Sequence, residues 1–218
     1  AASLVTAAVL WLGHLEVIMK GDNEPALQAL IERSMQLIRI KVADDASGTS
    51  LKRLSKEEPA PYDSQSNGAT EVGVMLIRGL FRTLKLCLGS QIGRFAPVGH
   101  PVISWLLEHT CLILNVRSRG SDGMTPWARV RGRAFGQQVV GFGEVVLCKL
   151  PVKRPRSQPD GNMGTTQGEG VSMGYNRNAN TFIIMTDDGK VEARSLVRKP
   201  AANRWSADRL AAVTATPW

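Results

Sequence analysis

The stretch DSQSNGATEVGVMLIRGLFRTLK, residues 63–85, predicts a turn followed by a long amphipathic helix. Asn67-Gly68 is a turn dipeptide, and Ser66 or Asn67 can cap the helix by accepting a hydrogen bond from a free backbone N–H. Glu71 then falls in the first helical turn, where the helix dipole favours a negative charge.

At 3.6 residues per turn, this helix has one apolar face and one charged face. The apolar face consists of Leu76, Ile77, Leu80, Phe81, Leu84 and Leu88, and the charged face consists of Glu71, Arg78, Arg82 and Lys85. The charged face has two interpretations. It is either a solvated surface with a few ion pairs, or a metal-binding carboxylate beside cations that bind phosphates.

A second acidic residue, Asp22, follows the apolar and β-branched run 15–21, which predicts a short buried strand. Pro25 suits the first turn of a helix over residues 25–36. Asp22 is therefore expected at the carboxyl end of a strand, the edge of α/β sheets where ligands and catalytic groups collect. A plain helix cap by Asp22 or Asn23 fits the same spacing, so both interpretations stay open.

The segment after this helix predicts a strand and then a loop. Residues 37–42 alternate apolar with polar side chains, which is typical of a strand. Asp44-Asp45, beside Ala-Ser-Gly, predicts a turn more than a metal-binding pair. Residues 46–63 are rich in Lys, Glu, Pro and Ser and predict a loop.

Residues 102–116 predict a second, strongly apolar helix that packs on the first one, with His109 as a satisfied core or edge histidine. The next segment, RSRGSDGMTPWARVRGRAF over residues 117–135, is densely cationic. Its arginines are Arg117, Arg119, Arg129, Arg131 and Arg133. Phosphate binding and ordinary solvation both remain open for them.

Residues 139–200 predict a small all-β barrel, because short strand-like runs alternate with turns, including a hairpin signal at Asp188-Gly189. Residues 151–170 predict a basic Pro/Gly-rich loop. A flavin or nucleotide loop is disfavoured there, since no strand-to-helix pattern precedes it. Residues 201–218 predict a helical tail in which Trp205 and Leu210 dock on the barrel.

The composition indicates a globular, basic protein. The chain has 218 residues, a net charge of +8 and a pI near 9.8, which favours a polyanionic partner such as nucleic acid, although acidic membranes also bind basic proteins. Residues 1–13 are too short to span a bilayer and lack the basic start of a signal peptide, so they predict a core helix. The chain begins without Met, which predicts a fragment or a decayed gene.

The cysteines and histidines show no metal-ligand spacing. Cys87, Cys111 and Cys148 are odd in number and far apart, and they predict buried reduced thiols in an intracellular protein. The histidines are His14, His100 and His109.

Three segments carry a family resemblance: KGDNEPALQAL (20–30), the stretch 63–85 and GSDGMTPWARVRGR (120–133). Together they resemble the integrase core of copia-type retrotransposons, which has a ribonuclease H-like fold. In that family an aspartate at a strand end precedes a helix, and a Ser-x-x-Asn-Gly-x-x-Glu-like segment opens a long helix. The resemblance implies that Asp22 and Glu71 are the second and third acidic residues of a catalytic triad.

The resemblance implies an α/β fold: a partial ribonuclease H-like integrase core over residues 1–135, with a mixed sheet and flanking helices, followed by the barrel. Intact relatives transfer DNA strands with Mg²⁺ or Mn²⁺ held by carboxylates, here Asp22 and Glu71. The expected DNA contacts are Asn67, Arg78, Arg82, Lys85, Arg129, Arg131 and Arg133.

This sequence departs from the family pattern in two ways. The family's first aspartate lies on an earlier strand, whereas the residues before Asp22 contain no aspartate. The step from Asp22 to Glu71 is also longer than the family's usual interval. We therefore expect weak or absent metal binding and no strand transfer by this chain alone.

The resulting hypothesis is an inactive, integrase-derived DNA-binding fragment of nuclear location, with DNA as partner and a possible homo-oligomer through an exposed sheet edge. No membrane or small-molecule cofactor is expected. Two alternatives are a non-enzymatic basic nucleic-acid-binding protein and a pseudogene remnant.

Overall fold

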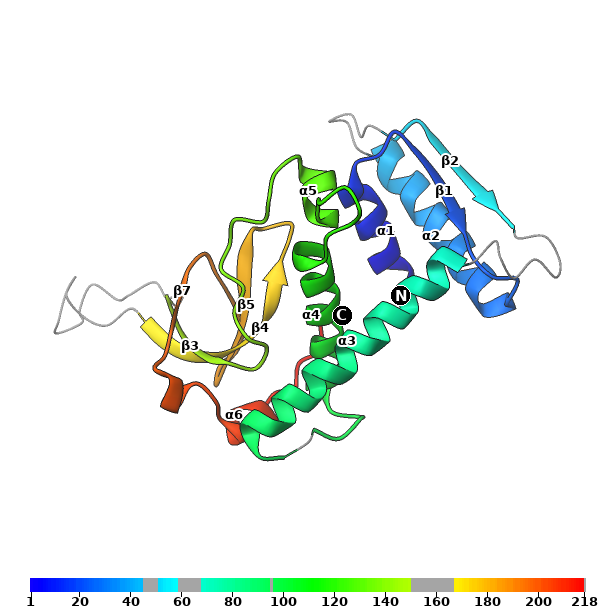
Figure 1. Cartoon of the computed structure of the whole chain (residues 1–218). Coiled ribbons are helices and arrows are strands. Elements are labelled where there is room, and N and C mark those ends of the chain that lie inside the picture. The colour runs from blue at the N-terminus through cyan, green and yellow to red at the C-terminus, as the bar shows by residue number, and fades with distance from the viewer. Residues whose placement is uncertain (45–50, 59–67, 95, 150–166, 218) are drawn as a thin grey trace. The chain divides into compact units, whose positions relative to one another are not determined.

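The computed structural model describes residues 1–44, 51–58, 68–94, 96–149 and 167–217 (Figure 1). The fold is mixed α/β, as predicted at that level, with a two-stranded parallel sheet and a five-stranded antiparallel sheet. The chain divides into two compact units, residues 1–75 and 76–217. We refer to them as unit 1 and unit 2, and each is described by itself. The predicted boundary between residues 135 and 139 stays a prediction.

Unit 1 contains a strand–helix–strand crossover. Helix α1 (Ala2–Leu12) ends at Gly13, whose φ of 68° is the left-handed conformation that glycine adopts without strain. Strand β1 (Glu16–Lys20), helix α2 (Pro25–Asp44) and strand β2 (Arg53–Glu57) follow, and β1 and β2 pair in parallel. A parallel pair needs such a crossover connection, which α2 provides.

Three predictions in unit 1 are wrong. The residues predicted as a strand, 37–42, continue α2 through Asp44, whereas Asp45, the second residue of the predicted turn, lies outside the described residues. The buried residues of α2 are Ile31, Ser34, Met35 and Ile38, a helical spacing that outweighs the local alternation. The predicted loop 46–63 contains β2. Strand β1 was predicted as buried, but it is alternately exposed and half-buried, because only one of its faces is covered.

Unit 2 begins within the long helix α3 (Gly68–Ile92), which confirms the predicted helix. Leu88 is buried, but Leu76 is 55% exposed, so the predicted apolar face does not extend to it. Helix α4 (Pro101–Arg117) is also confirmed. It starts at His100, whose Nδ1 accepts a hydrogen bond from the backbone N–H of Val102 at 3.2 Å.

The five-stranded sheet of unit 2 has the order β6-β5-β4-β3-β7 and is antiparallel throughout. Its strands are β3 (Val145–Lys149), β4 (Gln167–Asn176), β5 (Thr181–Thr186), β6 (Gly189–Ala193) and β7 (Leu196–Arg198). Because β6 and β7 lie at opposite edges and do not pair within the described residues, the predicted barrel is shown only as an open sheet.

The predicted hairpin is confirmed, with its turn one residue earlier than the Asp-Gly signal. Thr186 pairs with Gly189, so Asp187 and Asp188 form the turn and Gly189 begins β6 at a φ of 121°. Asp188-Gly189 therefore identified the hairpin, although the glycine belongs to the strand.

Both faces of this sheet bury apolar side chains, which alternate along β5 as a pleated strand requires. Ile183 and Met185 pack with Trp105 and Leu106 of α4, whereas Phe182 and Ile184 pack in a second cluster with Val146. The tail contains a 3₁₀ turn, η3 (Ala201–Asn203), and helix α6 (Ala207–Ala211). Leu210 is buried in the first cluster and Trp205 packs against it, as predicted.

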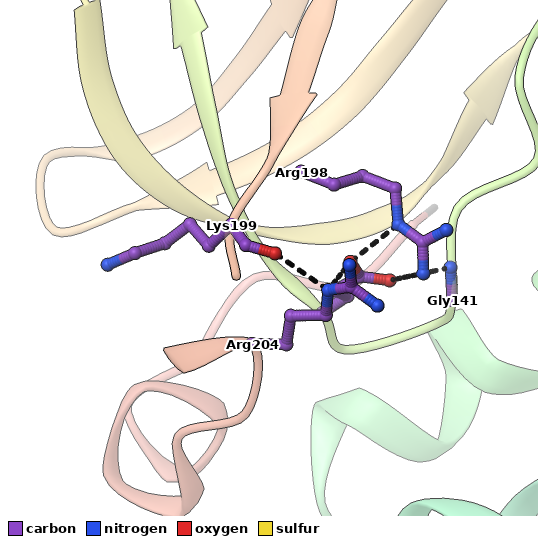
Figure 2. A network of polar contacts seen from close by, with 5 residues as sticks. Gly141, Arg198, Lys199 and Arg204 are labelled. Atoms are coloured by element: carbon purple, nitrogen blue, oxygen red, sulfur yellow. Dashed lines mark hydrogen bonds and ion pairs between the residues drawn. The ribbon is translucent and has the colours of Figure 1, made fainter. Parts of the chain in front are cut away.

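A fully buried carboxylate connects the start of β3 to the tail (Figure 2). Glu144 accepts hydrogen bonds from Nε and a terminal nitrogen of Arg198 at 2.7 and 2.9 Å. The Gly141 N–H donates at 3.3 Å to Oε2, the oxygen that also accepts from the terminal nitrogen of Arg198, and Nε of Arg204 lies 3.4 Å from Oε1. Arg204 also donates to the carbonyl oxygen of Lys199 at 2.7 Å. The hydrogen bonds from Arg198 to Glu144 raise the pKa of the Arg198 guanidinium.

The predicted burial of the thiols is partly wrong, since Cys87 is exposed, Cys111 half-buried and Cys148 buried. Burial raises the pKa of Cys111 and of Cys148. His109 is buried as predicted, but its Nδ1 has no hydrogen-bond partner in the described part of the chain. Burial lowers the pKa of His109 to about 4.

Candidate nucleic-acid interface

Asp22 lies where the sequence predicts, directly after β1 and before α2. The residue is exposed, and Oδ1 accepts a hydrogen bond from the backbone N–H of Asn23 at 2.8 Å. Its carbonyl oxygen accepts a hydrogen bond from the side-chain amide of Gln28 at 2.7 Å, which ties the strand end to the start of α2. Because Asn23 precedes α2, the Oδ1 contact is local and satisfies none of the free N–H groups inside the helix.

Glu71 lies in the first turn of α3 and is exposed, as predicted. Further along the same helix, Arg78 and Arg82 are exposed and Lys85 is half-buried. Asn67, the predicted cap and DNA contact, lies outside the described residues. Helix α3 therefore presents to solvent a carboxylate followed by cations.

The described residues do not complete a metal site. Asp22 and Glu71 offer carboxylate oxygens, the donors that Mg²⁺ prefers. However, no group of three or more Asp, Glu, His or Cys side chains comes together within residues 1–44, 51–58, 68–94, 96–149 and 167–217. Two-metal phosphoryl transfer needs a larger ligand set than two carboxylates. Within the described residues, Asp22 and Glu71 are therefore not part of a larger ligand set.

The Gly-x-Thr-Pro segment forms a loop that leads into helix α5 (Pro126–Arg131). The hydroxyl of Thr125 caps α5 by accepting a hydrogen bond from the N–H of Ala128 at 3.2 Å. Arg129 donates two hydrogen bonds to Asp122, at 2.9 and 2.7 Å, and this contact holds the pKa of Asp122 down at about 2. Arg129, predicted to contact DNA, is thus engaged in closing the loop.

Three aromatic rings contact one another in unit 2, and three arginines of the same segments act electrostatically on them or on one another; the segments are α5, the residues after it, and the end of β4 with the turn that follows. We call this the aromatic–arginine patch, and its members are Trp127, Arg131, Arg133, Phe135, Tyr175 and Arg177. The ring centres of Trp127 and Phe135 lie 4.9 Å apart, and those of Phe135 and Tyr175 lie 5.0 Å apart. Both pairs meet edge to face, the arrangement that aromatic quadrupoles favour.

One arginine lies over a ring, and a second acts electrostatically on another. The guanidinium of Arg131 lies over the Trp127 ring, 5.9 Å from its centre, which suits a cation–π contact. Burial raises the pKa of Tyr175, and the nearby charge of Arg133 opposes that rise. Arg131 and Arg133 are exposed, and all three rings are half-buried.

Arg177 brings a third positive charge, and the sequence analysis missed it. Burial lowers the pKa of its guanidinium, Glu108 opposes that shift, and Arg131 adds to it. The like charges of Arg131 and Arg177 therefore act on each other, although 45 positions separate them between α5 and the β4–β5 turn. Tyr175, two residues before Arg177, was the one available signal, since nucleic-acid surfaces combine aromatic and cationic residues.

No known protein-family model matches this chain, and no curated protein matches it either. No helix in the described part of the chain combines the length and apolar character that a bilayer crossing needs.

Proposed function

We propose that this chain is a retrotransposon-derived integrase fragment that binds DNA through the aromatic–arginine patch and does not join DNA strands on its own. The observation that carries the proposal is a set of three contacting aromatic rings with Arg131 over one of them, with Arg133 acting electrostatically on Tyr175 and Arg177 on Arg131. None of the three segments that supply them has this combination by itself.

The patch suits a polyanion on physical grounds. Exposed guanidinium groups bind phosphate oxygens through paired N–H donors, and such contacts dominate non-specific affinity for nucleic acid. Arg131 and Arg177 act on each other as like charges, and a phosphate between them would relieve that repulsion. Glu108 lies in the same electrostatic environment, but it is one carboxylate among several cations.

The integrase part of the proposal is supported by the order of elements in unit 1. The β1–α2–β2 crossover carries Asp22 at the end of its first strand, and α3 carries Glu71 in its first turn. The resemblance implies the same order around its second and third acidic residues. A ribonuclease H-like core, a closed barrel after it, and DNA integration by intact relatives belong to this proposal.

The test is a comparison of two variants that lose the same charge. The patch variant Arg131→Gln/Arg133→Gln/Arg177→Gln and the helix variant Arg78→Gln/Arg82→Gln/Lys85→Gln each remove three positive charges. Binding to a 20-base-pair duplex would be measured by fluorescence anisotropy across a salt series. We expect the patch variant to lower the slope of log affinity against log salt by about 2 to 3 and the helix variant to change it less.

The result that would overturn the proposal is an equal loss of affinity in both variants, since net charge alone would then explain binding.

The same titration, run with and without magnesium on the parent and on Asp22→Asn/Glu71→Gln, tests the acidic pair. We expect magnesium to affect this variant and the parent alike, because the described residues form no complete metal site. Tighter magnesium-dependent binding in the parent alone, or strand joining by the chain, would contradict the inactive part of the proposal.

A further inference from the structure

Strand β1 has one free edge within the described part of the chain. Its only sheet partner there is β2, in parallel register from Glu16 opposite Arg53 to Lys20 opposite Glu57. The carbonyl oxygen of Leu15 accepts hydrogen bonds from two backbone N–H groups on the β2 side, that of Lys52 at 2.7 Å and that of Arg53 at 3.2 Å. Backbone N–H and C=O groups point alternately to the two sides of a strand, so the odd-numbered residues of β1 direct theirs toward β2. Residues 16, 18 and 20 therefore direct their N–H and C=O groups to the open edge.

The side chains of these residues are exposed on one face of the strand. Ile18 is 63% exposed, and Glu16 and Lys20 on either side of it are exposed as well. An open strand edge with an exposed β-branched residue readily pairs with another strand. Two-stranded sheets are also marginal in isolation, and added strands stabilise them.

The sequence of β1, Glu-Val-Ile-Met-Lys, is complementary to itself when two copies run antiparallel. Placing Ile18 opposite the Ile18 of a second copy puts Glu16 opposite Lys20 on both sides of the twofold axis. Opposite charges directly across a sheet stabilise it, and like charges destabilise it. A parallel arrangement in matched register would put Glu16 beside Glu16 and Lys20 beside Lys20.

The neighbouring strand extends this pattern. Glu16 is opposite Arg53 in the observed register, and Lys20 forms an ion pair with Glu57 at 3.0 Å. In one row across the combined sheet, Arg53 and Glu16 of the first copy would be followed by Lys20 and Glu57 of the second copy. Positive and negative side chains would alternate over all four strands.

We infer that β1 is a self-association edge, through which two copies of this chain pair antiparallel around Ile18 into a four-stranded sheet β2-β1-β1-β2. The contact is isologous, so it closes as a dimer. This surface lies in unit 1 and does not involve the aromatic–arginine patch, so it stands or falls independently of DNA binding.

The test is sedimentation velocity of the full chain, free of nucleic acid, from 2 to 200 μM. Four variants accompany the parent: Ile18→Lys, Ile40→Lys, Glu16→Lys and Lys20→Glu. Ile40 is a matched control, because it is an apolar residue of unit 1 that is 54% exposed on α2. We expect the parent and Ile40→Lys to dimerise alike, and Ile18→Lys to raise the dissociation constant at least thirtyfold by setting two lysines face to face.

The two charge variants, Glu16→Lys and Lys20→Glu, test for restored association as well as for lost association. Glu16→Lys and Lys20→Glu should each stay monomeric, because each sets like charges opposite one another twice. Mixed together, they should form a heterodimer, since both cross-strand pairs become opposite again. A parent that stays monomeric, an Ile18→Lys variant that dimerises like the parent, or a mixture that does not associate would each overturn the inference.

Discussion

Replacing Glu144 with Gln tests whether the buried carboxylate holds unit 2 together. The side chain is fully buried and receives two hydrogen bonds from Arg198 and one from the Gly141 N–H (Figure 2). The amide of Gln has nearly the same shape but only one oxygen. In either orientation its NH₂ group would therefore face a guanidinium N–H of Arg198, donor against donor, and at the Oε2 position it would also face the backbone N–H of Gly141.

The expected cost follows from these contacts. A hydrogen bond to a charged group contributes roughly 1.5–3 kcal/mol, and removing one partner of a buried ion pair costs about 3–5 kcal/mol. The side chains of Arg198 and Arg204 are 36% and 32% exposed, so both can regain water contacts after the substitution, which reduces the loss. We expect the free energy of unfolding of unit 2 to fall by about 3 kcal/mol.

Native-state hydrogen exchange measures this loss in unit 2 separately from unit 1. The amides of Val146 and Ile184 belong to fully buried residues of the sheet, and 3 kcal/mol corresponds to about 150-fold faster exchange. The control is Asp187→Asn, in which an 82% exposed carboxylate lies 4.0 Å from Arg209 and should have little effect. If Glu144→Gln speeds exchange by less than tenfold, the buried contacts do not stabilise unit 2 as argued.

Two further predictions concern pH. The pKa of His109 is about 4 in the folded chain and about 6.5 in the unfolded chain. Between these pH values the unfolded state binds one proton more than the folded state. The free energy of unfolding therefore falls by roughly 3 kcal/mol as the pH is lowered from 6.5 to 4. Urea unfolding of unit 2 should show this fall in the parent but not in His109→Gln, and identical pH profiles would refute it. The pKa of Asp122 is about 2, so its contribution to stability is complete above about pH 4 and is lost as pH falls toward 2. A carbon-13 titration should place the carboxyl midpoint near 2 and return it toward 3.9 in Arg129→Ala; an unchanged midpoint would assign the shift to another cause.

The helices show which parts of the secondary structure the local sequence pattern predicts correctly. Residues 63–85 predicted α3 because period, turn and first-turn acid all agree, and Pro25 predicted the start of α2. Residues 37–42 were misassigned because six alternating side chains also fit the end of a long helix. The burial of Ile38 beside Met35, which only the folded chain shows, resolves that ambiguity.

In the candidate site, some residues could be placed from the sequence and others only from the folded structure. Asp22 at a strand end and Glu71 in a first helical turn could be placed from sequence, since each depends on its immediate neighbours. Arg129 was assigned to DNA, but its bond to Asp122 depends on the loop's path. Arg177 was missed because the fold, and no local pattern, brings it near Arg131.

The sequence by itself determined the main helices, the hairpin at Gly189, the basic charge and the positions of two acidic residues along the chain. These properties follow from backbone preference and from periodicity over a few neighbours. Only the tertiary structure decided that the buried Glu144 pairs with Arg198, that three aromatic rings from separate segments contact one another beside Arg131, and that β1 has an open edge within the described residues. Each of these depends on contacts between residues far apart in the chain, and those contacts form only when the strands pair and the apolar faces pack.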